Sequence, residues 1–226
     1  MLSAQEAISR LAFFPIKGKK WHQKTVLDAS SPKTVVIFGA ARGGTTMVAR
    51  VVQSLGIHLG DDIGINLEDD AFNLQKLQLL PSKEPEALKA SLLQTIQERN
   101  QARDVWGWKY PKAARYLPLI LPALRNPLFI CVFRDCISTS SRMLGPKMSK
   151  GKNPLNVLDV NLNTQMENLR LMRNSNVPSL LCSYEKSISD PTDFVKTLAN
   201  FLGVNFNKRV LKAAAEQIVP GSYLKD

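Results

Sequence analysis

The chain has 226 residues, of which 44% are hydrophobic and 22% are charged, a composition that suits a single soluble domain over residues 1–226 with a sizeable buried core. The formal net charge of +11 and a pI near 9.7 favour anionic partners such as nucleotides and sulfated or phosphorylated sugars. Three cysteines without a CxxC pair argue against a disulfide framework or a zinc site.

The N-terminal residues 1–33 are predicted to form a helix followed by a basic loop. Residues 1–14 alternate apolar and polar side chains at helical spacing, and four lysines lie between residues 17 and 24. We expect this helix to pack on the domain, with weak association at an anionic membrane surface as the alternative. The segment does not resemble a signal peptide, no apolar stretch is long enough to span a bilayer, and the cysteines fit a reducing compartment, so a cytoplasmic protein is expected.

The run at residues 34–38 is β-branched and uncharged, which is typical of a central parallel strand buried on both faces. Glycines between residues 39 and 44 end it. A helix is predicted over residues 45–55, where apolar residues recur at helical spacing and Gly56 provides a stop.

The segment between this strand and helix has the features of an anion-binding loop. Gly43 and Gly44 allow backbone N–H groups to approach a ligand closely, and the helix N-terminus adds unpaired donors and partial positive charge. Thr45 and Thr46 add hydroxyl groups, and Arg42 adds a full charge. We therefore predict a phosphate-binding loop, with a plain strand-to-helix turn as the alternative.

This loop differs from the Walker A motif of P-loop NTPases, in which a lysine directly precedes the hydroxyl residue. Gly44 stands in that position, and the loop contains no lysine that could reach a γ-phosphate. A nucleotide kinase is therefore less favoured, and it is retained as an alternative.

A second apolar strand is predicted over residues 128–133, and it ends abruptly at Arg134. A guanidinium at a strand end suits bidentate recognition of phosphate. On the helix predicted over residues 136–144, Ser138 and Ser141 can share a face and add hydroxyls to the same phosphate. A surface Arg–Asp pair beside a serine-rich helix start is the alternative.

A third strand is followed by Tyr184 and Glu185, and the tyrosine could contact a purine ring or its edge, with a core-edge tyrosine as the alternative. Residues 60–84 are acidic and show no clear periodicity. The other predicted elements are helices over 86–101, 116–124, 155–173, 191–202 and 207–217, strands over 105–109 and 179–183, and a mobile loop over 145–154.

Strands that alternate with helices predict an α/β fold: three layers, with a mostly parallel central sheet flanked by helices. In such sheets ligands bind at the carboxyl ends of the strands. Polar clusters follow three of the predicted strands, at Arg42–Thr46, Arg134–Asp135 and Tyr184–Glu185. Lys109, the last residue of a further strand, would point toward the same edge, with a solvated lysine as the alternative. We therefore expect them to share one site.

These motifs, in this order, resemble those of the sulfotransferases that use 3′-phosphoadenosine-5′-phosphosulfate (PAPS). The resemblance covers residues 35–203 and has four parts in order along the chain. They are the loop Ala41-Arg-Gly-Gly-Thr-Thr46, the segment Trp108-Lys-Tyr-Pro111 found in bacterial members, the strand end Phe133-Arg-Asp135, and the run of Tyr184-Glu185, Asp190-Pro191 and Phe201-Leu-Gly203. Departures from the family pattern are Ala41, Gly43, Cys136, and Arg142 where the family has a serine.

The resemblance implies the P-loop NTPase-like sulfotransferase fold and transfer of a sulfuryl group from PAPS to an acceptor hydroxyl or amine, without a metal ion. The product nucleotide would be adenosine 3′,5′-bisphosphate (PAP), and the expected acceptor is a carbohydrate or small metabolite. The implied nucleotide-binding residues are Arg42, Gly43, Gly44, Thr45 and Thr46 at the 5′ end, and Arg134, Ser138, Ser141 and Tyr184 around the 3′-phosphate and the base. An inactive PAPS- or PAP-binding relative is a further alternative.

The resemblance also suggests catalytic roles. Arg42 would stabilise charge on the leaving phosphate, and because a guanidinium is a very poor proton donor, Lys109 or water would be the acid. Asp62 lies closest to the position of the carboxylate base in relatives, followed by Glu68 and then His58. No zinc finger or RNA-binding motif is present, so no nucleic-acid partner is expected.

Overall fold

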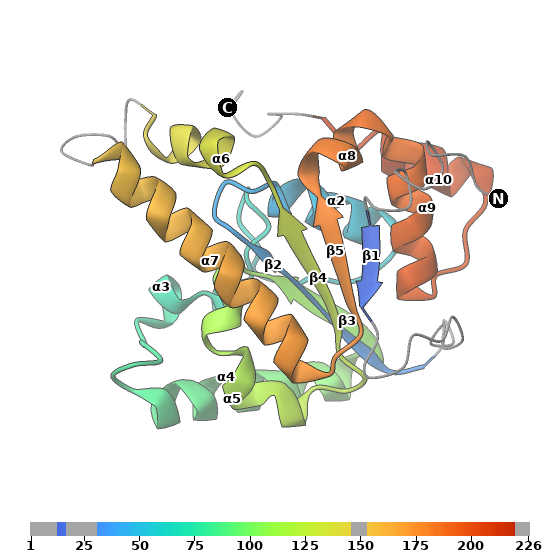
Figure 1. The fold of residues 1–226 in the computed structure, drawn as a ribbon. Coiled ribbons are helices and arrows are strands. Elements are labelled where there is room, and N and C mark those ends of the chain that lie inside the picture. Colours follow the sequence, from blue (N-terminus) through green and yellow to red (C-terminus); the bar gives the residue numbers. More distant parts are fainter. Residues whose placement is uncertain (1–12, 17–30, 146–152, 220–226) are drawn as a thin grey trace.

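The computed structural model of the protein describes residues 13–16, 31–145 and 153–219 (Figure 1). Most of the predicted N-terminal helix, the lysines between residues 17 and 24, and most of the predicted loop over residues 145–154 lie outside the described residues.

Five strands and a series of helices make up the described structure. The strands are β1 (Phe13–Ile16), β2 (Lys33–Gly39), β3 (Val105–Lys109), β4 (Leu128–Phe133) and β5 (Ser179–Ser183). The α-helices are α2 (Thr45–Ser54), α3 (Leu74–Leu77), α4 (Pro85–Ala102), α5 (Leu117–Ile120), α6 (Cys136–Met143), α7 (Pro154–Ser175), α8 (Tyr184–Ser189), α9 (Pro191–Leu202) and α10 (Lys208–Ala215). Short 3-10 turns are η1 (Asp70–Phe72), η2 (Ala113–Arg115) and η3 (Leu121–Ala123).

The strands form one sheet in the order β1-β5-β4-β2-β3. All neighbouring pairs are parallel except β1 with β5. Because β2 lies at the centre of the parallel part, its carboxyl end is flanked by the ends of β3 and β4. The predicted α/β fold with a mostly parallel sheet is confirmed.

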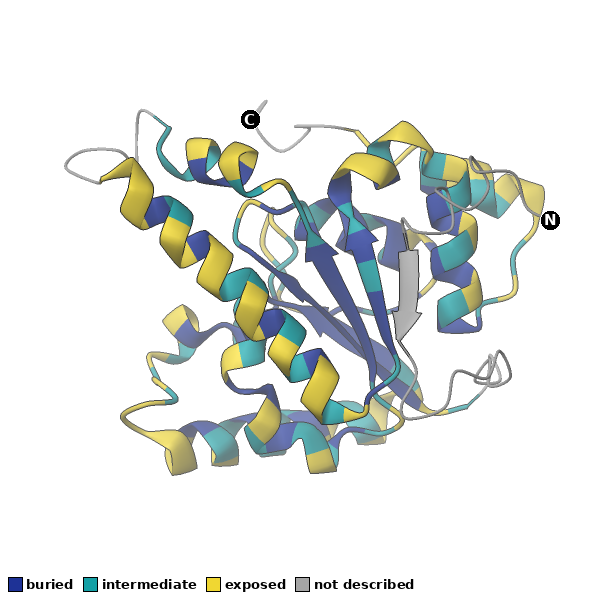
Figure 2. Cartoon of the chain, in the orientation of Figure 1, coloured by how far each residue is buried: buried dark blue, intermediate teal, exposed yellow. Residues whose placement is uncertain are grey.

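Helices cover both faces of the sheet, so the central strands are buried on each side (Figure 2). Val35 and Ile37 of β2 point to a core shared with α2, α9 and α10. Val36 and Phe38 point to the opposite core, which β3, α4 and α5 complete. This alternation explains why β2 is an uninterrupted apolar run: side chains on both faces leave water.

The predicted helix over residues 1–14 is wrong where it can be checked, since Phe13–Ile16 form strand β1. Phe13 pairs with Cys182 of β5 in an antiparallel register. Without β1, the N–H and C=O groups along the edge of β5 would lack strand partners. The hydrogen bonds gained by pairing with this edge outweigh the local preference for a helix. Sequence periodicity reports only the local preference.

Two further elements differ from prediction. The helix predicted over residues 116–124 is broken into short turns, α5 and η3, because Pro118 and Pro122 lack the N–H groups that a continuous helix needs. Helix α8 was not predicted. It begins directly after β5, where the Ser183 side chain accepts a hydrogen bond from the backbone N–H of Lys186.

All three cysteines are free thiols, and Cys131 and Cys182 are buried. Burial raises the pKa of both buried thiols. Among the helices of the described residues, none combines the length and apolar character required to cross a bilayer.

Strands β2 and β3 approach closely at Gly107, which lies opposite Val35. A Cβ atom at Gly107 would lie 2.1 Å from the Val35 carbonyl oxygen. We predict that Gly107→Ala lowers the free energy of unfolding by about 1–3 kcal/mol, because backbone atoms must shift to admit the methyl group. Urea denaturation measures this change.

The matched control is Gly64→Ala, since Gly64 lies in an exposed turn where the nearest atom to an added Cβ is 3.5 Å away. This variant should stay within about 0.5 kcal/mol of the unmodified chain. Equal stability of the two variants would contradict the close strand approach.

Candidate functional site

The polar groups predicted to share a site lie at one edge of the sheet. The loop Arg42–Thr46 follows β2, Lys109 ends β3, Arg134 follows β4 and Tyr184 follows β5. In Figure 1, α6 and α8 start at the upper ends of β4 and β5. Parallel neighbours place these ends side by side.

Arg134 connects three of these strand ends. Its Nη1 donates a hydrogen bond of 3.2 Å to the carbonyl oxygen of Arg42 in the loop after β2. Its guanidinium carbon lies 4.2 Å from the centre of the Tyr184 ring, within the range of a cation–π interaction. The Arg134 carbonyl accepts a hydrogen bond of 3.2 Å from Gln165 of α7. The two arginines singled out in the sequence are therefore brought together.

Tyr184 supports both Arg134 and the loop, with only 6% of the residue exposed. A Cβ atom at Gly44 would lie 2.2 Å from Cδ2 of the tyrosine ring, so the ring packs directly on the Gly44 backbone. Gly44 has a φ of 96°, a conformation that favours glycine. Because Arg134 covers one face of the ring, that face is not open to a purine, and the predicted purine contact could use only another part of the residue.

The loop after β2 presents the N-terminus of α2 without a side-chain cap, because Gly44 is the N-cap residue. The first backbone N–H groups of a helix have no partner within it, so they are available to an anion. Arg42 is exposed and has a φ of 64°, the left-handed conformation. The Gly43 N–H donates to the Ala40 carbonyl at 2.9 Å and closes the turn.

Glu185 joins the ends of β4 and β5, a role that the sequence motif did not reveal. Its Oε1 accepts a hydrogen bond of 3.0 Å from the backbone N–H of Asp135. The contact is long-range, so no local pattern predicts it; the Tyr-Glu pair after a strand was the available signal.

Both candidate serines are exposed on α6, three residues apart. The Ser138 N–H donates to the Asp135 carboxylate at 2.7 Å. This bond, together with one from the Ser138 side chain, lowers the pKa of the Asp135 carboxyl. Ser138 therefore helps to cap α6, and its predicted role toward a phosphate, like that of Ser141, stays a prediction.

Lys109 forms a buried ion pair with Glu68. Its Nζ lies 3.0 Å from Glu68 Oε1 and donates at 2.9 Å to the Asn66 carbonyl. The same carbonyl accepts a hydrogen bond of 3.1 Å from the Thr46 hydroxyl. The acidic segment is thus tied to the start of α2, at Thr46, through one backbone oxygen of Asn66, a residue that carries no signal in the sequence.

The Lys109 side chain is buried, with 1% of the residue exposed. Burial lowers the pKa of the Lys109 ammonium, and the neighbouring Glu68 carboxylate partly offsets that effect. The second oxygen of Glu68 accepts a hydrogen bond of 3.1 Å from Asn73. Both members of the pair are therefore held in fixed positions.

The other two base candidates have different surroundings. Asp62 lies in an exposed turn, where its backbone carbonyl accepts from the Asp70 N–H at 3.1 Å. His58 pairs with Asp61 and Arg99 at 3.0 and 3.2 Å. It bridges to Trp106, three residues before the end of β3, and is thus not joined to the strand-end cluster. Burial and the Arg103 charge lower the His58 pKa.

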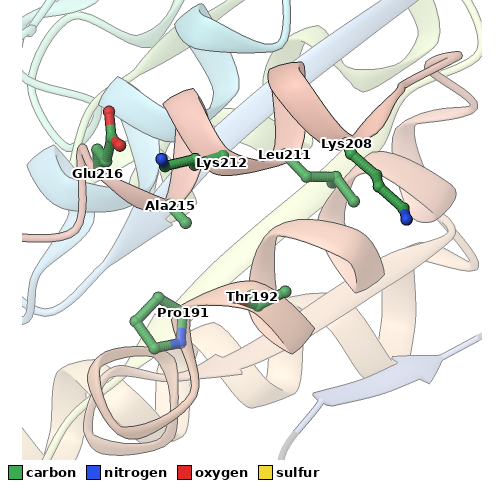
Figure 3. Close-up of a pocket in the computed structure, with 7 residues that line it drawn as sticks. All are labelled: Pro191, Thr192, Lys208, Leu211, Lys212, Ala215 and Glu216. Atoms are coloured by element: carbon green, nitrogen blue, oxygen red, sulfur yellow. The ribbon is translucent and has the colours of Figure 1, made fainter.

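A separate cavity of about 430 Å³ lies between α9 and α10 (Figure 3). Pro191 and Thr192 line one side, and Lys208, Leu211 and Lys212 line the other. None of the strand-end residues lines it. Within the described ranges, no three His, Cys, Asp or Glu side chains are grouped so as to hold a metal ion.

The Lys109–Glu68 pair generates a stability prediction. Glu68→Gln should lower the free energy of unfolding by about 1–3 kcal/mol, because the buried ammonium loses its counter-charge. The double variant K109M/E68Q should lose less than the sum of the two single losses, since no unpaired charge then remains buried. Thermal and urea denaturation of the three variants measure the coupling.

Glu98→Gln serves as the control, because Glu98 lies on the exposed surface of α4. If Glu68→Gln unfolds at the same denaturant concentration as Glu98→Gln, the ion pair does not contribute as described.

No family profile and no curated protein matches the sequence significantly. Solved structures do match. The sulfotransferase domain of the Synechococcus PCC 7002 olefin synthase aligns with a TM-score of 0.57 and 18% identity over 91% of this chain and 84% of that one. Mouse sulfotransferase SULT7A1, solved with PAP, aligns with a TM-score of 0.54 and 12% identity over 87% and 66% of the two chains.

A Mycobacterium tuberculosis sulfotransferase aligns with a TM-score of 0.53 and 13% identity over 83% of this chain and 72% of that one. Identities this low concern the arrangement of the backbone, which aligns over 83–91% of this chain. The fold expected from the sequence motifs is therefore confirmed: this chain has the sulfotransferase fold.

Proposed function

We propose that the protein is a sulfotransferase that moves the sulfuryl group of PAPS to a hydroxyl or amine of a carbohydrate or small metabolite and releases PAP. The observation that carries this proposal is the contact between Arg134 and the Arg42 carbonyl, 3.2 Å long. It supports one nucleotide lying across the carboxyl ends of β2 and β4. The sulfotransferase fold supports the same reaction class.

The 5′-phosphosulfate would lie on the loop Arg42–Thr46. The uncapped N-terminus of α2 offers backbone N–H groups there, and the exposed Arg42 side chain offers a positive charge. Sulfuryl transfer resembles phosphoryl transfer in needing alignment and neutralisation of charge more than covalent help. Arg42 would accordingly stabilise the charge that grows on the departing PAP.

The 3′-phosphate would lie beside Arg134. Its Nε atom is buried and has no hydrogen-bond partner among the residues that the structure describes. Buried donors are rarely left unpaired, so a missing acceptor is a reason to expect a ligand close by. Ser141, exposed two residues before the end of α6, is the candidate for a second contact.

Lys109 is the candidate for the acid. Its lowered pKa makes the ammonium a better proton donor than an ordinary lysine. Its contact with Asn66, which also binds Thr46, leaves the amino group close to the phosphate loop.

Glu68 and Asp62 are the candidates for the base that takes the acceptor proton. Glu68 is fixed in the pair with Lys109, and Asp62 is exposed. A proton taken by Glu68 would weaken its attraction for Lys109 and so favour release of the lysine proton to the leaving group. Glu68 therefore suits a coupled acid–base pair, and Asp62 suits an independent base.

The main rival, a P-loop nucleotide kinase, meets a steric obstacle. The Walker lysine would stand at Gly44, where even a Cβ atom would lie 2.2 Å from the Tyr184 ring. The loop therefore has neither the lysine nor the space for one.

The first prediction tests nucleotide binding. Calorimetry should show PAP binding to the unmodified protein without Mg²⁺, and much weaker binding of Mg-ATP. Arg134→Ala should weaken PAP binding about tenfold to a hundredfold, because a charge-assisted hydrogen bond contributes about 1.5–3 kcal/mol.

Arg209→Ala removes an equal charge from the exposed surface of α10 and should leave PAP affinity nearly unchanged. Thermal unfolding without nucleotide checks that both variants fold. Equal PAP affinity in the Arg134 and Arg209 variants, or tighter binding of Mg-ATP than of PAP, would refute the proposed site.

The second prediction concerns the leaving group. Arg42→Ala should lower kcat by about a hundredfold or more while weakening PAP binding less, because its charge matters most as the sulfur–oxygen bond breaks. Turnover is measured with labelled PAPS and an acceptor identified by screening. Unchanged kcat would rule out this role, and PAP binding without turnover of any acceptor would indicate an inactive relative.

A further inference from the structure

Helix α7 carries an apolar stripe that faces solvent. Leu155, Leu162 and Met166 are 72%, 45% and 46% exposed. At about 100° per residue, these three side chains fall within about 40° of one another around the helix axis, along about 16 Å of its length. Figure 1 shows α7 crossing the front of the sheet, and Figure 2 shows exposed positions along the whole helix.

The stripe is distinct from the face that holds α7 in the fold. Val157, Asn161, Asn168 and Met172 are buried and form that inward face. Isolated exposed leucines are common on proteins, but three large apolar side chains aligned on one helix mark a contact surface.

Charges of opposite sign lie in the two halves of the helix. Asp159 lies between Leu155 and Leu162, and Arg170 and Arg173 lie beyond Met166. All three are exposed, and no ion pair within residues 153–219 or with the other described segments involves them. Asp159 accepts a hydrogen bond of 3.1 Å from Asn163 of the same helix.

We propose that α7 is the interface of a homodimer in which two copies of this helix pack antiparallel across a two-fold axis. An axis level with residue 164 sets Leu162 against the partner's Met166, and Met166 against the partner's Leu162. With the same axis, Asp159 and the partner's Arg170 lie at nearly the same level, about 1.5 Å apart as measured along the helix. In this register the apolar contact is between Leu162 and Met166 and the charge contact is between Asp159 and Arg170, while Leu155 lies level with the partner's Arg173, whose aliphatic stem can pack on it.

The order of the charges along α7 favours an antiparallel over a parallel arrangement of the two copies. A parallel pair would set Asp159 against the partner's Asp159 and arginine against arginine, which is repulsive. In an antiparallel pair, each acidic end meets a basic end, twice by symmetry. A self-complementary patch of this kind is what a two-fold interface requires. The proposal goes beyond the proposed function and does not depend on nucleotide binding.

The first test is sedimentation of the full chain over a range of concentrations. The unmodified protein should form dimers, and Leu162→Asp should raise the dimer dissociation constant at least about tenfold. Val160→Asp is the matched control: Val160 is 55% exposed on the same helix but points about 160° away from Leu162. A monomer at every concentration, or equal effects of the two variants, would overturn the proposal.

Charge reversal tests whether a second copy of the chain covers the stripe. D159R and R170D should each weaken the dimer, because like charges then meet across the interface. An equimolar mixture of the two variants should form a heterodimer, since both cross-interface pairs again have opposite charges.

The double variant D159R/R170D should also recover dimerisation by itself. Recovery in the mixture cannot arise if the stripe is covered by another segment of the same chain or by an unrelated protein. Failure of both the mixture and the double variant to recover the dimer, with the variants folded by thermal unfolding, would show that the antiparallel register is wrong.

Discussion

The position of one guanidinium organises the carboxyl edge of the sheet. Arg134 leaves β4, donates to the Arg42 carbonyl after β2, and covers the Tyr184 ring after β5. That ring in turn fills the space that a side chain at Gly44 would need. The conformation of the phosphate loop, the orientation of the arginine and the start of α8 therefore depend on one another. In the proposed function, the group that binds one end of the nucleotide also supports the loop that binds the other end.

A second network extends the site toward β3. The Asn66 carbonyl accepts from both Lys109 and the Thr46 hydroxyl, and Glu68 neutralises the lysine. A buried ammonium is tolerated because a carboxylate and a carbonyl replace its water. This arrangement places the candidate acid, a candidate base and the phosphate loop within a chain of direct contacts. It also explains why an acidic segment without regular secondary structure is held in a defined position.

Sequence reasoning succeeded where local chemistry decides the structure. The apolar run of β2 and the glycines after it specify their elements through local properties. It failed where the partner is distant in sequence. Strand β1 forms because the edge of β5 is available, although its partner lies more than 160 residues away. Helix α8 is a different case: its serine cap is local, but the helix begins directly at a strand end and is only six residues long. The Glu185 contact with the Asp135 N–H spans 50 residues, so no local pattern reports it.

By itself, the sequence determined the fold class, the glycine-rich turn after β2 and the set of polar residues at the strand ends, because strand periodicity and glycine placement are local properties. Only the tertiary structure decided how those residues are used. It set Tyr184 beneath Arg134, paired Lys109 with Glu68 in preference to Asp62, and left one stripe of α7 exposed. These outcomes depend on strand order and on side chains that meet across the sheet edge, and the pairing of distant segments is what a linear pattern of residues does not specify.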